Sequence, residues 1–115
     1  MPHASKGMGG PRVVFAVYQP RQGQDAKLRA LIAEHLPTLR RLQLATDRPA
    51  ILLKSDSGAY VEIFEWQSDE AAERAHDHPE VARIWEAMGK IAEFKPLASL
   101  PETKTAFSHY EPVAL

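Results

Sequence analysis

Residues 50–66 decide the fold, and they read AILLKSDSGAYVEIFEW. Two apolar runs, 50–54 and 59–66, flank the turn-forming sequence 55–58, a pattern typical of a β-hairpin. Successive side chains of a strand point to opposite faces of the sheet. In the second run, one face therefore carries Tyr60, Glu62, Phe64 and Trp66, and the other carries Ala59, Val61, Ile63 and Glu65.

A strand and a helix are predicted before this hairpin. Ordered structure is expected to begin at Arg12. The run 13–18, VVFAVY, is apolar on both faces and predicts a strand. From Asp25 the apolar residues follow the spacing of one helical stripe, which predicts a helix over 25–36 with Asp25 as its cap. Pro37 is expected to end this helix and begin a short second turn, because proline lacks the N–H donor and costs about 3 kcal/mol in a helix interior.

Helices and a further strand are predicted after the hairpin. Ser68 is expected to cap a helix with an acidic first turn, and Pro79 to interrupt it and open another helix that runs to about Phe94. A fourth strand is predicted at 106–110, where Pro112 stops it.

The resulting order, β-α-β-β-α-β, predicts the α+β class. It corresponds to the ferredoxin-like split βαβ arrangement, a four-stranded antiparallel sheet with helices on one face. The strands are too apolar to leave the other face in water, so we expect a homodimer that buries it. Residues 1–11 are expected to form a flexible leader, and 12–115 a single domain.

The composition of the chain argues against several classes of binding partner. The chain has 115 residues, no cysteine, and a formal net charge of −1 from 14 basic and 15 acidic residues. This balance argues against nucleic acid or an anionic membrane as a partner. The β-α-β-β-α-β order also builds RNA-recognition motifs, but Glu62 at the centre of the matching strand argues against RNA. With neither a signal peptide nor an apolar run of about 18 residues, the expected location is cytoplasmic.

The segment after the hairpin resembles a known family. Residues 66–71, WQSDEA, followed by Ala75-His76 and by 78–81, HPEV, are similar to the strand-to-helix segment of the antibiotic biosynthesis monooxygenase (ABM) family. The resemblance extends over about 13–113 and implies a dimeric α+β barrel with a cleft between sheet and helices in each subunit. Members include cofactor-free oxygenases of polycyclic phenols, haem-degrading enzymes, quinol oxygenases and proteins without an assigned activity.

Individual residues of this chain can be compared with the functional positions of the family. Trp66 matches a cleft tryptophan of the oxygenases that act on aromatic substrates. Where those enzymes place an amide that can polarise a substrate carbonyl, this chain has Glu62. Trp85 stands nearest to the histidine that ligates iron in the haem-degrading relatives, and it cannot bind iron, so haem degradation would require His76 or His78. The sequence also contains no Ser-His-Asp set on a recognisable elbow and no dinucleotide fingerprint after a strand, so a cofactor-free or substrate-assisted reaction is the enzyme class that its residues leave open.

Glu62 and the histidines are the candidate chemical groups. Glu62 lies among aromatic residues, where desolvation can make a carboxylate a base near neutral pH; a salt bridge is the alternative. His76 is the candidate proton shuttle. Residues two apart on a helix point about 200° away from each other, so His76 and His78 do not share a metal, and no metal site is expected. His35 lies on the apolar stripe of its helix. It is expected either to be a structural residue or to point a ring nitrogen into the cleft.

The predicted function is a homodimer that binds a small aromatic or quinone-like molecule and acts as a cofactor-independent monooxygenase. Glu62 and His76 are the predicted catalytic residues. The alternative is a non-enzymatic dimeric ligand-binding or stress-associated module. This alternative is favoured if bulky side chains fill the cleft or if an arginine forms an ion pair with Glu62. The predicted substrate contacts are Trp66, Tyr60, Phe64, Trp85, His78 and His35.

Overall fold

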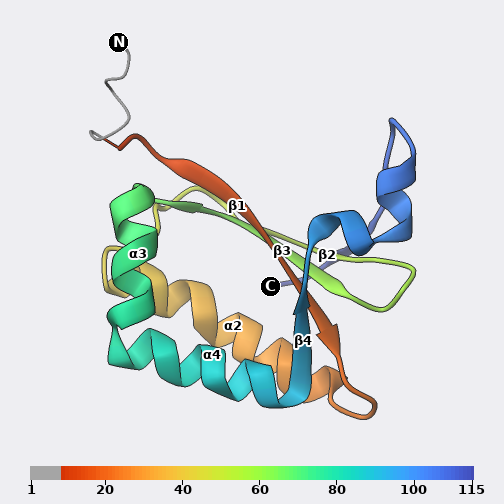
Figure 1. The fold of residues 1–115 in the computed structure, drawn as a ribbon, viewed down its shortest axis with the longest axis horizontal. Coiled ribbons are helices and arrows are strands. Elements are labelled where there is room, and N and C mark those ends of the chain that lie inside the picture. The colour runs from red at the N-terminus through yellow and green to blue at the C-terminus, as the bar shows by residue number, and fades with distance from the viewer. Residues whose placement is uncertain (1–8) are drawn as a thin grey trace.

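The computed structural model describes residues 9–115. Most of the expected leader, 1–11, therefore lies outside the described residues. The chain folds into strands and helices that form one sheet and a helical layer (Figure 1). In order, the elements are β1 (Arg12–Pro20), α2 (Asp25–Arg41), β2 (Ile51–Lys54), β3 (Tyr60–Trp66), α3 (Asp69–Asp77), α4 (Pro79–Ile91), β4 (Ala92–Lys95), the 3-10 turns η1 (Leu97–Ser99) and η2 (Pro101–Lys104), and β5 (Glu111–Val113).

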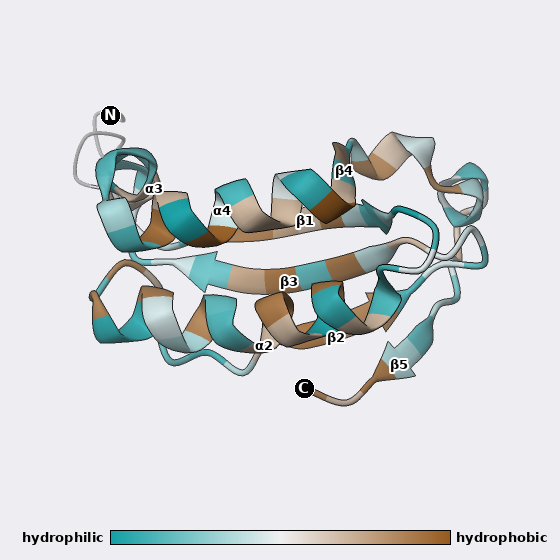
Figure 2. Ribbon diagram, turned by 90° about the horizontal axis from the view of Figure 1, so that it is seen from below, coloured by the Kyte–Doolittle hydropathy of each residue, from teal (hydrophilic) through white to brown (hydrophobic). Residues whose placement is uncertain are grey.

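The strands form one antiparallel sheet in the order β4-β1-β3-β2-β5. The three helices lie on one face of it, and β3 is seen between α2 and α4 in Figure 2. This α+β architecture is compatible with a ferredoxin-like fold. The predicted hairpin is confirmed as β2 and β3. The prediction of four strands was wrong, because β5 adds a fifth strand beside β2.

The fourth strand lies earlier in the chain than predicted. It is β4, which begins directly after α4, where Ala92 adopts extended backbone angles (φ −151°, ψ 160°). Ile91 and Ala92 continue the apolar spacing of α4, which is why the sequence pattern extended the helix to about Phe94. Residues 106–110 form no strand. Pro112, predicted to stop a strand, lies inside β5, and an edge strand tolerates a residue without an N–H donor.

Helix α2 runs through Pro37, so the predicted break at this residue was wrong. Pro37 itself is exposed, while Leu36 and Leu39 on either side are buried. The apolar stripe on both sides of the proline keeps the helix packed on the sheet, and this burial offsets the missing hydrogen bond. As a result, His35 is held in the middle of a long helix.

The junction between α3 and α4 follows the predicted capping. The Ser68 hydroxyl accepts a hydrogen bond from the Ala71 amide at 3.0 Å, and Pro79 occupies the first turn of α4. His78 is the residue between the two helices, and its Nδ1 accepts a hydrogen bond from the Glu80 amide at 3.2 Å. Both helix starts are therefore capped by a side chain, and His78 alone separates α3 from α4.

The sheet has two different apolar faces. The helix-covered face holds most of the buried side chains, including Leu28, Ile32, Phe64 and Ile84. On the opposite face, Leu100 from the segment after η1 is buried against Val17, Ala59 and Val61. Other side chains of that face are exposed: Val13, Phe15 and Ile51 are 52%, 50% and 53% exposed.

None of the helices among residues 9–115 has the length and apolar character needed to pass through a lipid bilayer.

Candidate functional site

The aromatic face of β3 points toward the helices. Its residues alternate as predicted: Tyr60 and Glu62 both hydrogen-bond to side chains of α2, and the ring of Phe64 lies 5.6 Å from that of His35. Phe64 and Trp66 meet edge to face, with ring centroids 5.0 Å apart. This strand therefore supplies both a buried carboxylate and an aromatic wall to the space beneath the helices.

Glu62 is fully buried and is bonded from two sides. The Tyr18 hydroxyl of β1 donates to its Oε1 at 2.6 Å. His35 Nδ1 of α2 lies 2.9 Å from Oε1 and 3.2 Å from Oε2. Within residues 9–115, no lysine or arginine forms an ion pair with Glu62. The ion pair between an arginine and Glu62, which would have favoured the alternative function, is therefore not observed among these residues.

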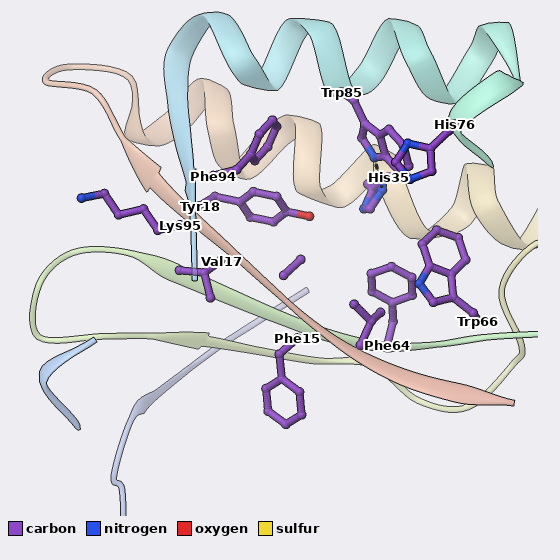
Figure 3. Close-up of a pocket in the computed structure, with 12 residues that line it drawn as sticks. Phe15, Val17, Tyr18, His35, Phe64, Trp66, His76, Trp85, Phe94 and Lys95 are labelled. Carbon is purple, nitrogen blue, oxygen red and sulfur yellow. Dashed lines mark hydrogen bonds between the residues drawn. The ribbon is translucent and has the colours of Figure 1, made fainter. Parts of the chain in front are cut away.

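Trp85 of α4 fixes the protonation state of His35. Its indole nitrogen lies 2.9 Å from His35 Nε2. An indole N–H can only donate, so Nε2 carries no proton and the ring proton of neutral His35 sits on Nδ1. Nδ1–H then donates to Glu62. The result is a chain in which Trp85 donates to His35, and both His35 and Tyr18 donate to Glu62 (Figure 3 draws the Trp85–His35 bond).

The Tyr18 hydroxyl stays protonated in this environment. Burial raises the pKa of Tyr18 well above its ordinary value, and the neighbouring charge of Glu62 and the hydrogen bond to it raise the pKa further. The phenol is therefore a permanent donor to the carboxylate across the physiological pH range.

A cavity of about 390 Å³ lies beside this chain. Figure 3 shows the Tyr18 hydroxyl directed into the same space that Trp85, His76, Phe64 and Trp66 surround. The residues that border it are mostly apolar and aromatic: Val14, Phe15, Ala16, Val17, Tyr18, His35, Phe64, Trp66, His76, Trp85, Phe94 and Lys95. Of these, Phe15 points its ring away from the helices, toward the opposite face of the sheet (Figure 3).

Glu62 does not line this cavity. It reaches the cavity only through Tyr18 and His35, which do. The carboxylate is therefore separated from the cavity by its two hydrogen-bond donors.

The remaining predicted site residues separate into two groups. His76 is exposed at the cavity, with its ring edge-on to Trp85 at 5.0 Å between centroids. Tyr60 and His78 do not line the cavity. The Tyr60 hydroxyl bonds to both carboxylate oxygens of Asp25 at 2.9 Å, and His78 caps α4. Both of these residues have structural roles.

The sequence analysis did not single out Tyr18. A signal for it existed, because alternation along β1 puts Tyr18 on the same face as Val14 and Ala16. In a split βαβ sheet the first strand pairs with the third. The observed register sets Ala16 opposite Glu62 and Tyr18 opposite Tyr60, so the hydroxyl of Tyr18 reaches the carboxylate diagonally.

Among residues 9–115, no three histidine, aspartate or glutamate side chains converge in a way that would hold a metal ion. No family model, curated protein or solved structure matches the chain.

Alkaline pH is expected to destabilise the protein through Tyr18. Its pKa is raised in the folded state, so its contribution is complete below pH 10, the ordinary value, and is lost as the pH rises from there toward the folded-state pKa. Urea unfolding of the wild type and Tyr18→Phe between pH 8 and pH 11 tests this. The free energy of unfolding of the wild type should fall more steeply above pH 10, and equal slopes would contradict the assignment.

Proposed function

We propose that the chain forms a homodimer in which each subunit binds a small aromatic molecule in this cavity and oxidises it without a cofactor. The observation that carries the proposal is the aromatic cavity built against the His35–Glu62 pair. Its volume of about 390 Å³ is at the lower end of ligand sites, which supports a ligand of two or three rings. Phe64, Trp66 and Trp85 offer ring faces and edges for stacking.

His35 is the base that this geometry supports best. His35 lines the cavity, its Nε2 lone pair accepts the Trp85 N–H, and Glu62 holds the opposite nitrogen protonated. A proton taken up at Nε2 would turn His35 into an imidazolium directly bonded to a carboxylate, which compensates the new charge in a buried place. The role expected of Glu62 thereby changes from a base to a residue that orients the base and stabilises its charged form.

The proposed reaction begins with the transfer of a ring hydroxyl proton to His35 Nε2. The resulting phenolate is electron-rich enough to reduce molecular oxygen directly. For a ring with a free para position, a phenol and one O₂ give a para-quinone and one water. One oxygen atom becomes the new carbonyl, and the other leaves as water with the hydroxyl hydrogen and the ring hydrogen. The protein needs to supply the base and a dry aromatic slot.

The uncovered half of the sheet supports the homodimer. The strand register sets Phe15 opposite Ile63, and Ile63 opposite Ile51, so these three residues form a continuous apolar row across β1, β3 and β2. Phe15 and Ile51 are about half exposed in the single chain. An apolar row in the middle of a sheet face is typical of an association surface. A second copy that presents the same row is the occupant we propose, because the match is then self-complementary.

One observation favours a binding module without catalysis. Both ring nitrogens of His35 already have partners, since Trp85 occupies Nε2. If Trp85 keeps this position when a ligand is bound, His35 cannot act as a base. The protein would then hold an aromatic molecule in the cavity and leave it unchanged.

Oxygen uptake with α-naphthol tests the proposed function. We expect α-naphthol to raise the melting temperature and to be consumed with oxygen. We expect Glu62→Gln to slow the consumption by about 100-fold or more, because it no longer holds His35 in the required tautomer. Tyr60→Phe, on the same face of β3 but outside the cavity, is the matched control and should retain the rate. Binding without uptake would favour the binding module, and the absence of both would refute the proposal.

A further inference from the structure

We infer that the cavity selects the hydroxyl form of its aromatic ligand and rejects the quinone form. This inference rests on the proposed function and deepens it by naming the ligand's polar group. It follows from the direction of the hydrogen bonds around Glu62, which commit the hydrogens of Tyr18 and His35 to the carboxylate, so that these two lining side chains meet a ligand as acceptors.

The side chains of Tyr18 and His35 have no hydrogen to offer a ligand. The Tyr18 hydroxyl hydrogen is directed to Glu62 at 2.6 Å, so its oxygen faces the cavity only as an acceptor. The Nδ1 hydrogen of His35 is also directed to Glu62, and Nε2 is an unprotonated acceptor. Because burial and Glu62 fix both hydrogens, neither side chain reverses its polarity to suit a carbonyl.

Trp85 shows what kind of group this end of the site accepts. Its indole N–H donates a hydrogen bond to His35 Nε2. A ligand hydroxyl can replace this N–H like for like, so the buried acceptor stays satisfied. A quinone carbonyl can displace Trp85 only by leaving Nε2 and the carbonyl oxygen facing each other without a hydrogen. Trp85 is half-buried and lies beside the exposed ring of His76, so it borders the open side of the cavity.

A donor of the cavity lining lies on the other side, at Trp66. This indole N–H belongs to the end of β3 and is next to Phe64 in Figure 3. Lys95, the cationic lining residue, points away from the cavity in the same view. A ligand with both a hydroxyl and a carbonyl is therefore expected to place its hydroxyl at His35 and its carbonyl toward Trp66.

This polarity has a consequence for turnover. The proposed reaction consumes a hydroxyl and produces a para-quinone, which has lost the hydrogen that the site recognises. The product is therefore bound more weakly than the substrate, and the Trp85 N–H can return to His35 as the quinone leaves. Product inhibition by the quinone is expected to be weak.

Anaerobic calorimetry with three related ligands tests the inference: α-naphthol, its methyl ether and the corresponding para-quinone. The methyl ether keeps the rings and the oxygen but lacks the hydrogen. The chain contains no cysteine that a quinone could modify. We expect α-naphthol to bind at least about tenfold more tightly than either of the other two, the difference that one well-placed buried hydrogen bond makes.

Glu62→Gln is the variant that should remove this selection. The glutamine amide can donate to His35 Nδ1, which allows the ring proton to move to Nε2 and offer a donor to the cavity. The three affinities should then lie within about threefold of one another. Trp85→Phe removes the competing N–H and should strengthen the preference for α-naphthol. Tyr60→Phe should leave the wild-type order unchanged, and circular dichroism verifies that each variant is folded.

The outcomes separate this inference from the function on which it rests. If α-naphthol binds tightly and the other two weakly in the wild type but not in Glu62→Gln, the inference is supported. If the three ligands bind the wild type equally well, or the quinone binds best, the inference is wrong while aromatic binding stands. If none of the three binds, the proposed function itself is wrong.

Discussion

Replacing His35 with leucine is expected to lower the free energy of unfolding by about 3 kcal/mol, since a hydrogen bond to a buried carboxylate is lost together with a neutral one. His35 is 2% exposed and has bonds on both ring nitrogens, one to Glu62 and one from Trp85. Leucine is close enough in volume that a large cavity is not the cause of the loss. Urea unfolding at neutral pH measures the effect.

Two further variants assign this loss to the hydrogen bonds. His76→Leu changes an exposed histidine of the same cavity and is expected to alter the free energy of unfolding by less than about 0.5 kcal/mol. Adding Glu62→Gln to His35→Leu should recover about 1 kcal/mol, because a neutral amide is less costly to leave buried than a carboxylate that has lost a donor. A double variant that is less stable than His35→Leu alone would contradict the assignment of the loss to the hydrogen bonds of Glu62.

Phe15→Asp is expected to dissociate the proposed homodimer, raising its dissociation constant at least about 100-fold. The substitution puts a carboxylate at the centre of the apolar row that a second copy would cover, where the charge would be buried without a partner. Sedimentation velocity over a range of protein concentrations measures the change. Because the interface is expected to be self-complementary, one substitution alters both sides of it.

Phe107→Asp is the matched control for this experiment. Phe107 is 84% exposed, more than Phe15, and lies in the connection between η2 and β5. It is outside the strand row, so its replacement should leave the dimer intact. If Phe107→Asp dissociates the protein and Phe15→Asp does not, the association surface is this connection and the proposed sheet interface is wrong.

The centre of the sheet could be predicted from the sequence, and its edges could not. The hairpin was predictable because residues 50–66 combine alternating apolar positions with a turn, and each strand is flanked by polar breaks. The strand at 92–95 was hidden because Ala92 extends the apolar spacing of α4, and only pairing with β1 reveals an extended backbone there. Similarly, the helix penalty of Pro37 is local, whereas the burial of Leu36 and Leu39 that overcomes it depends on the sheet.

The candidate site, like the fold, could be predicted only in part. The alternation of β3 correctly grouped Glu62, Phe64 and Trp66 on the helix side. It did not reveal that Glu62 lies behind Tyr18 and His35, because the depth of a side chain depends on its neighbours in other elements. The direction of the hydrogen bonds could not be predicted from the sequence either, because it follows from the approach of Trp85 to one particular nitrogen of His35.

The protonation of the His35 ring is the most direct test of the account. Nitrogen-15 NMR of the imidazole at neutral pH, with and without α-naphthol, reports which ring nitrogen carries a proton. We predict a proton on Nδ1 and a bare Nε2 in the ligand-free protein, and a change at Nε2 together with the Trp85 indole signal when α-naphthol is added. A proton on Nε2, or on both nitrogens, in the ligand-free protein would contradict the account.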